Sequence, residues 1–306
     1  MSRYDVLVLM STYNGEKFIA EQLDSILCQE GCNVHLLIRD DGSTDGTKLI
    51  LKKYASCHEN ISLMKDGGNL KPAKSFMTLL CSSLSYEYYA FADQDDIWKK
   101  DKLLAGIKVL EGLEIPAIYT ANAYFVDSKG ESMNKLEHTF SNIHTNAETI
   151  LSISQFLGCT MVFNDKLADI IRTGGIPDTI IMHDFYLSSV CVLIGGLVKY
   201  DPEPHMYYRQ HANNTIGVSS SIISKVQERT KRMFLKKKVN VYDQLKDIYA
   251  RYPTLIKREE KKFADIIIKS ENSLYCRIRL FLSRRVHYEN MNQAISHRVA
   301  FLLGNK

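Results

Sequence analysis

The sequence lacks the cysteine patterns that indicate a zinc site or a disulfide framework. Its seven cysteines are odd in number, scattered, and form no CxxC pair. We therefore expect reduced thiols in a cytoplasmic protein. The apolar run at the N-terminus is too short for a signal peptide, and no stretch reaches the length needed to span a membrane.

Two glycine motifs of nucleotide-binding proteins are also missing. The chain contains no GxGxxG and no GxxxxGK[ST], which disfavours Rossmann cofactor binding and P-loop chemistry. The charge is uneven, because residues 225–306 contain 20 Lys and Arg against 8 Asp and Glu, whereas the remainder contains 19 against 27. A basic tail on an acidic body favours an anionic partner for the tail and argues against nucleic-acid binding by the body.

Apolar runs that predict buried strands alternate with helical patterns over the first hundred residues. Strands are expected at 6–10, 34–38, 61–64 and 88–92, each of the first three followed by an amphipathic helix. Pro72 is expected in the first turn of the third helix, with Leu84 among the side chains facing inward. This alternation is typical of a doubly wound, mostly parallel α/β sheet in a chain long enough for one large domain and an appendage.

Polar clusters follow three of these strands. They are STYNG at 11–15, DDGSTDGT at 40–47 and DQDD at 93–96. Ligands bind beyond the carboxyl ends of parallel strands, so these clusters are predicted to form one site. In an extended chain Asp93 and Asp95 share a side and Gln94 turns away. Two adjacent carboxylates favour a hard divalent cation, although a solvated acidic turn is the alternative.

Taken together, the motifs resemble family 2 inverting glycosyltransferases. The three N-terminal clusters resemble the first half of that family, while HDF at 183–185 and YRQHANN at 208–214 resemble its bacterial rhamnosyltransferase-like branch. The resemblance implies a GT-A type nucleotide-diphospho-sugar transferase fold, Rossmann-like and mostly parallel, as a catalytic domain at 1–218. A linker at Ser219–Ser221 would begin a basic helical region at 219–306. The QxxRW motif of processive members is replaced by RQHANN, which favours addition of a single sugar.

The resemblance also implies roles for the residues of the first motifs. Ser11 and Tyr13 line a nucleotide pocket, and Asp41 accepts a hydrogen bond from the base, as a carboxylate does well from a ring N–H. Asp93 and Asp95 contact the ribose and a Mn²⁺ or Mg²⁺ ion, with Asp95 the expected ligand.

Three residues of these motifs have competing interpretations. Asp41 could cap a helix, but Ser43 or Thr44 is the expected cap. Arg209 suits the oxygens of a diphosphate, and His211 could contact the diphosphate or bind the metal. Both could instead be packing or surface residues.

Asp184 in the HDF motif is the candidate catalytic base. An inverting transfer needs one carboxylate to take a proton from the acceptor hydroxyl, while the metal stabilises charge on the departing diphosphate. The alternative is that Asp184 caps the helix beginning at Phe185, in which case Asp178 or Asp201 would be the next candidates. His183 is expected to orient its neighbour or to contact the acceptor.

The expected function is metal-dependent, inverting transfer from dTDP-rhamnose or a UDP-hexose to a lipid-linked or oligosaccharide acceptor in bacterial surface polysaccharide synthesis. One rival is a sugar-phosphate nucleotidyltransferase, which would need a glycine-rich basic loop in place of STYNGEK. The other rival is a non-catalytic protein that retains the fold.

The basic tail contains a predicted amphipathic helix at 273–286. Leu274, Ile278, Phe281 and Leu282 lie near one face, with arginines 277, 284 and 285 beside or opposite them. Such a helix could lie on an anionic membrane surface. It could also pack on the catalytic domain or on a second copy of the chain in a homodimer.

Overall fold

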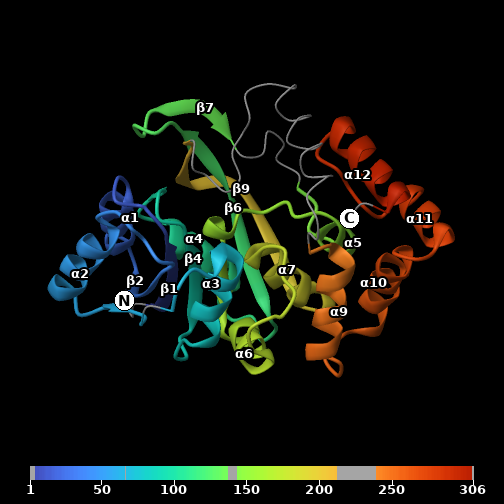
Figure 1. Ribbon diagram of the computed structural model, residues 1–306, viewed down its shortest axis with the longest axis horizontal. Helices are drawn as coiled ribbons and strands as arrows, with labels where there is room; N and C mark the ends of the chain where they lie inside the picture. Colours follow the sequence, from blue (N-terminus) through green and yellow to red (C-terminus); the bar gives the residue numbers. More distant parts are fainter. Residues whose placement is uncertain (1–3, 66, 137–142, 212–238, 305–306) are drawn as a thin grey trace.

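The computed structural model describes residues 4–65, 67–136, 143–211 and 239–304, which form a central sheet covered by helices (Figure 1). The nine-stranded sheet has the order β3-β2-β1-β4-β8-β6-β9-β5, and β7 pairs with β6. Its first four strands are parallel and confirm the predicted ones: β1 (Tyr4–Thr12), β2 (Cys32–Asp40), β3 (Ile61–Leu63) and β4 (Tyr88–Ala92).

Both faces of this parallel half are buried, which explains its continuous apolar strands. In β1, Leu7 and Leu9 belong to one hydrophobic cluster, whereas Val6, Val8 and Met10 belong to the other. Helix α3 (Lys71–Cys81) covers the first cluster, and α1 (Ile19–Leu27), α2 (Thr47–Cys57) and α4 (Lys102–Leu110) cover the second. The sheet is therefore doubly wound, as predicted.

The second half of the sheet is mixed. Strand β8 is antiparallel to both β4 and β6, and β9 is parallel to β6 and antiparallel to β5. The strands are β5 (Ile97–Trp98), β6 (Ala117–Val126), β7 (Ser132–Leu136), β8 (Val162–Asn164) and β9 (Leu197–Arg209). The helices are α5 (Ala147–Ser152), α6 (Asp165–Gly174) and α7 (His183–Leu193), with a short 3-10 turn at Gly158–Thr160.

Two local expectations were wrong. Helix α3 ends at Cys81, so Leu84 lies beyond it and is largely exposed. Helix α2 begins after Gly46, and neither Ser43 nor Thr44 caps it. Ser43 instead donates to Asp40 Oδ1 (2.5 Å) and accepts from the Asn14 N–H (2.8 Å), so it joins the loops that follow β1 and β2.

The C-terminal helices share a core with the sheet. Helices α9 (Val241–Arg251) and α10 (Arg258–Ser270) bury Leu245, Ile248 and Ile267 in the cluster that contains α7. Helices α11 (Leu274–Phe281) and α12 (Met291–Leu303) lie outside them (Figure 1). The expected boundary between 218 and 219 and the expected linker fall outside the described residues.

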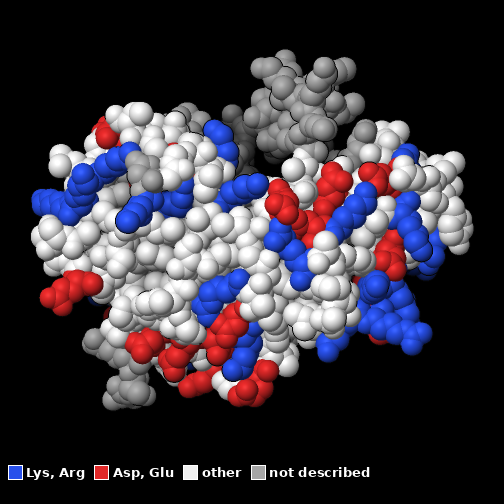
Figure 2. Space-filling view, turned by 60° about the horizontal axis from the view of Figure 1, so that its bottom comes forward, with Lys and Arg blue, Asp and Glu red and all other residues white. Residues whose placement is uncertain are grey.

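Two further expectations concern the whole chain. None of the seven cysteines forms a disulfide. Within the four described ranges, none of the helices has the length and apolar character required to cross a bilayer. Figure 2 shows Lys and Arg side chains on the side of the molecule where α10–α12 lie.

Candidate active site

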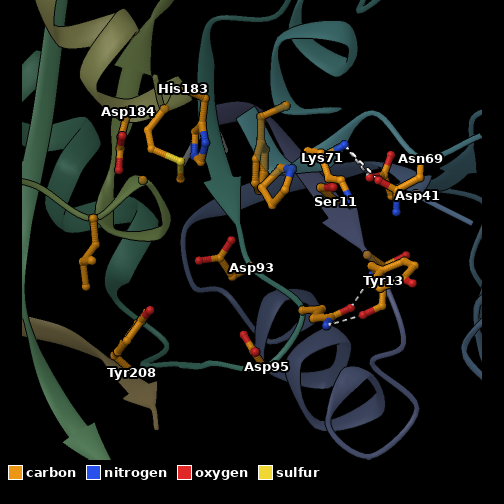
Figure 3. Close-up of a pocket in the computed structure, with 17 residues that line it drawn as sticks. Ser11, Tyr13, Asp41, Asn69, Lys71, Asp93, Asp95, His183, Asp184 and Tyr208 are labelled. Atoms are coloured by element: carbon orange, nitrogen blue, oxygen red, sulfur yellow. Dashed lines mark hydrogen bonds between the residues drawn. The ribbon is translucent and has the colours of Figure 1, made fainter. Parts of the chain in front are cut away.

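A pocket of about 230 Å³ opens where the loops after β1, β2 and β4 meet the start of α7. Figure 3 shows Asp41 and Asp184 on opposite sides of it, with Asp93 between them. The pocket brings together six predicted site residues, namely Ser11, Tyr13, Asp41, Asp93, Asp95 and Asp184. The predicted convergence of the strand ends is therefore confirmed.

Asp41 is held firmly at one end of the pocket. Its carboxylate accepts from the Leu70 N–H and the Lys71 N–H (both 2.8 Å) and pairs with the Arg39 guanidinium. Asp41, which lies in the loop after β2, thus accepts hydrogen bonds from N–H groups at the start of α3. A carboxylate offers about four acceptor positions, so these three contacts leave one for a ligand.

A side-chain clamp joins the loops after β1 and β4. Gln94 Oε1 accepts from the Tyr13 N–H (2.7 Å), and Gln94 Nε2 donates to the Tyr13 carbonyl (3.0 Å). A Cβ atom on Gly15 would lie 2.4 Å from Gln94 Oε1, so a side chain there would displace the Gln94 amide from these hydrogen bonds. Gln94 thus lines the same pocket as Asp93 and Asp95, and it also connects two loops, a structural role that the sequence pattern did not predict.

Four carboxylates from the loop after β4 and the start of α7 form an acidic centre whose members affect one another's pKa. Burial, followed by the charges of Asp95 and Asp184, raises the pKa of Asp93 to about 7. Asp96 is fully buried, and burial, followed by the charges of Asp95 and Asp93, raises its pKa well above its usual value. Ligand atoms of Asp93, Asp96 and Cys159 all lie within 4.8 Å of one another.

The expected metal ligands lie next to each other. Asp95 Oδ2 is 2.7 Å from His211 Nε2, and the imidazole stacks on Phe18 with a centroid separation of 4.9 Å. Carboxylate oxygen and imidazole nitrogen suit Mn²⁺, and carboxylate oxygen suits Mg²⁺, whereas the Cys159 thiol is a soft donor that neither ion prefers. The neighbouring carboxylates repel one another, and a cation would reduce that repulsion. The carboxylate of Asp95 and the imidazole of His211 therefore fit a divalent cation.

Arg209 lies behind the pocket rather than on its lining. Its guanidinium donates to the carbonyls of Asp95 (2.8 Å) and Ser128 (3.2 Å) and pairs with Glu21 (2.5 Å). The side chain is almost fully buried. These contacts connect α1 with two loops and direct the guanidinium at protein oxygens, so the structure does not place Arg209 with the other predicted nucleotide-binding residues.

Asp184 lies in the first turn of α7 and faces the pocket. The helix is preceded by Met182 as its N-cap, so the capping alternative for Asp184 was wrong. Its Oδ1 accepts from the Phe185 N–H (2.6 Å), and burial raises the pKa of the carboxyl to about 6. Asp178 and Asp201 do not line the pocket. Asp184 is therefore a buried carboxylate that ionises within the physiological range.

His183 forms the wall behind Asp184. Its ring stacks on Phe76 at a centroid separation of 4.0 Å, and neither ring nitrogen has a hydrogen-bond partner among the described residues. Burial lowers its pKa to about 3, so the imidazole is neutral. A Cβ atom on Gly158 would lie 2.2 Å from His183 Nε2, which makes glycine necessary there.

Several lining residues were not predicted as site residues, among them Lys71, Gly158 and Tyr208. Asn69 also lines the pocket, and the Gly-Gly-Asn sequence at 67–69 that ends in it is a weak local signal for this part of the site. Lys71 has a φ of 67°, a conformation that residues with a Cβ rarely adopt. The sequence Lys-Pro does not predict this conformation.

Comparisons with known proteins agree with this architecture. The family model described as glycosyl transferase family 2 matches residues 7–170. The dTDP-rhamnosyl transferase RfbG of Shigella flexneri is 30% identical over 236 residues, which cover 71% of this chain and 76% of that protein.

Two solved structures share the fold at lower identity. The mannosyltransferase PcManGT from Pyrobaculum calidifontis, in complex with GDP-Man and Mn²⁺, has a TM-score of 0.55 at 20% identity, covering 100% of this chain and 88% of that one. S. aureus TarS 1–349 in complex with UDP-GlcNAc has a TM-score of 0.53 at 17% identity, covering 98% and 90%.

The doubly wound sheet and the acidic pocket at its strand ends define a glycosyltransferase of the GT-A type. The chain belongs to glycosyl transferase family 2, as the motifs predicted.

Proposed function

We propose that this enzyme transfers a sugar from a nucleotide-diphosphate donor to an acceptor hydroxyl by a metal-dependent, inverting displacement. The observation that carries the proposal is the single pocket shared by Asp41, Asp93, Asp95 and Asp184. Three of these carboxylates come from loops at strand ends and the fourth from the start of α7. Donor recognition, metal binding and proton abstraction thus each have a group within one cavity.

The nucleoside would bind at the end of the pocket formed by Ser11, Tyr13 and Asp41. The remaining acceptor position of Asp41 suits the N3–H of uracil or thymine, which favours a UDP or dTDP donor. Asp93 would contact the ribose. The likeness to RfbG supports dTDP-rhamnose as the donor to test first.

Asp95 and His211 would hold a Mn²⁺ or Mg²⁺ ion. When bound, the ion supplies Lewis-acid stabilisation of the charge on the diphosphate leaving group. We infer that Arg209 contributes by fixing the backbone of Asp95, because its guanidinium donates to the Asp95 carbonyl and to other protein oxygens.

Asp184 would take the proton of the acceptor hydroxyl as that oxygen attacks the anomeric carbon. A base with a pKa of about 6 is ionised at neutral pH and still basic enough to assist the attack. One carboxylate suffices, because a single displacement inverts the anomeric carbon without a covalent intermediate. The neutral His183 packs behind this residue and would keep it in place.

The acceptor would be a lipid-linked or free oligosaccharide in bacterial surface polysaccharide synthesis, such as capsule or O-antigen, at the inner face of the cell membrane. A relative from Escherichia coli, named as a glucosyltransferase that uses GlcNAc-diphosphoundecaprenol, supports this class of acceptor. It is 30% identical over 39% of this chain and 46% of its own.

The experiment is a panel of nucleotide sugars incubated with the protein and Mn²⁺, Mg²⁺ or EDTA, followed by detection of released nucleoside diphosphate. We expect release from a dTDP- or UDP-sugar with metal and none with EDTA. A nucleotidyltransferase would instead form a nucleotide sugar from a sugar phosphate and a nucleoside triphosphate. A protein that retains only the fold would turn over no donor.

A further inference from the structure

Helix α11 and the residue that follows it present one face to the protein and an apolar face to solvent. Leu280 is buried beneath the helix, whereas Leu274, Ile278 and Leu282 are between 42% and 65% exposed. These three residues are spaced four apart and form one stripe. Tyr275, beside that stripe, is 68% exposed. The predicted apolar face of this segment is therefore largely uncovered.

Helix α12 repeats the arrangement. His297 and Phe301 are buried, whereas the stripe Met291, Ile295, Val299 and Leu303 is exposed, again at a spacing of four residues. The two helices pack together at the outer edge of the molecule (Figure 1). Single exposed apolar side chains are normal on a protein surface, but two exposed apolar stripes on adjacent helices make a larger exposed apolar area than such isolated residues do. We call these two stripes the α11–α12 apolar face.

Cationic side chains accompany this face. Residues 272–304 contain five arginines and one acidic residue. Two of the arginines hold the local backbone, because Arg277 donates to the Ser270 carbonyl (2.8 Å) and Arg298 to the Ser283 carbonyl (3.2 Å). Within the described residues, Arg279 and Arg284 have no carboxylate at ion-pair distance. Their charge remains available to a ligand.

A hollow of about 490 Å³ lies between α10 and the end of α11. Four cations line it together with apolar residues that include Phe263 and Leu280. Two of the cations have carboxylate partners, because Lys262 pairs with Glu259 (2.7 Å) and Arg285 with Glu148 (3.2 Å), whereas Arg279 and Arg284 have none among the described residues. The guanidinium groups of Arg279 and Arg284 suit a lipid phosphate, because guanidinium binds phosphate oxygens through paired hydrogen bonds. Figure 2 shows Lys and Arg side chains at this end of the molecule, with Asp and Glu side chains among them.

We propose that the α11–α12 apolar face docks on an anionic lipid bilayer, with headgroup phosphates at Arg279 and Arg284. Charge favours lipid over a second copy of the chain. A symmetric pair would bring two faces of like positive charge together, whereas anionic headgroups complement them. The apolar stripes would enter the boundary between headgroups and acyl chains, as amphipathic helices do. The inference does not depend on the sugar-transfer chemistry.

The test is co-sedimentation of the full chain with phosphatidylglycerol vesicles and with neutral phosphatidylcholine vesicles. We expect binding to the anionic vesicles at low salt, weakening as salt rises, and little binding to the neutral ones. The variant Arg279→Gln/Arg284→Gln should bind about 30-fold more weakly, since each surface cation contributes about a fivefold factor. The affinity of Leu282→Asp/Ile295→Asp for the vesicles should fall on the order of 10- to 100-fold for each leucine-sized side chain withdrawn from the bilayer.

Matched controls lie on α2, at the opposite side of the molecule (Figure 1). Leu49→Asp changes a leucine that is 73% exposed, and Lys52→Gln/Lys53→Gln removes two exposed cations. Both controls should bind vesicles like the wild type, and thermal unfolding should show that all variants fold. Equal binding to neutral vesicles, or unchanged binding by both tail variants, would overturn the proposal. The proposal would also be overturned if the wild type bound no anionic vesicles and instead formed a concentration-dependent dimer. In that case Leu282→Asp/Ile295→Asp would dissociate the dimer.

Discussion

Replacing Asp184 by asparagine should separate the catalytic task of this carboxylate from its effect on stability. Burial raises its pKa from 3.8 to about 6 in the folded protein. The unfolded chain keeps the ordinary value, so the folded state binds more protons between about pH 4 and about pH 6. The wild type therefore loses stability as the pH rises through that window. A shift of about two pKa units corresponds to about 3 kcal/mol.

The Asp184→Asn variant carries no charge at this position and avoids that loss. At pH 8 its free energy of unfolding should exceed that of the wild type by up to about 3 kcal/mol, and near pH 4 the two should be nearly equal. The asparagine amide oxygen can still accept from the Phe185 N–H, now 2.6 Å from Asp184 Oδ1, which preserves the start of α7. Urea unfolding at both pH values measures the difference.

Activity should change in the opposite direction. The variant should keep its donor affinity and lose roughly 10²–10⁴ in transfer rate, the usual contribution of a general base. The wild-type rate should fall as the pH drops below about 6, where Asp184 takes up its proton. Asp178→Asn is the matched control, because Asp178 is exposed and pairs with Arg251 outside the pocket. A variant with near wild-type turnover, or with no gain in stability at pH 8, would refute the reasoning.

Two further predictions concern the metal and the wall of the pocket. Asp95→Ala should abolish the metal-dependent part of UDP or dTDP binding in calorimetric titrations while the protein stays folded; unchanged affinity would show that Asp95 is not a ligand. Gly158→Ala should lower transfer at least tenfold, because its Cβ would lie 2.2 Å from the buried ring of His183 and displace the start of α7. In the control Gly67→Ala the nearest atom would be 3.5 Å away, and equal activity of the two variants would contradict this explanation.

The parallel half of the fold and its site could be predicted from the sequence for a physical reason. Strands buried on both faces must be apolar throughout, as Val6 to Met10 are, and the loops at their carboxyl ends must converge. The three local clusters therefore sufficed to predict that Ser11, Tyr13, Asp41, Asp93 and Asp95 lie in one pocket. The helix periodicity also predicted α3, but the exposed Leu84 shows that periodicity alone does not mark where a helix ends.

Features that depend on long-range contacts could not be predicted. Nothing local indicates that β8 inserts antiparallel between β4 and β6. Arg209 is hydrogen-bonded to Glu21, Asp95 and Ser128, which are all distant from it in the sequence. Its burial therefore depends on the assembled fold. The amphipathic pattern of α9 and α10 likewise shows that one face is covered but does not identify what covers it.

The central claim is a single displacement assisted by one carboxylate, and the anomeric configuration of the product tests it most directly. The donor that the nucleotide-sugar panel selects is incubated with the enzyme and metal, and proton NMR records the transferred or released sugar before it mutarotates. The account predicts the anomer opposite to that of the donor. A product that retains the donor configuration would require a second displacement and would contradict the account.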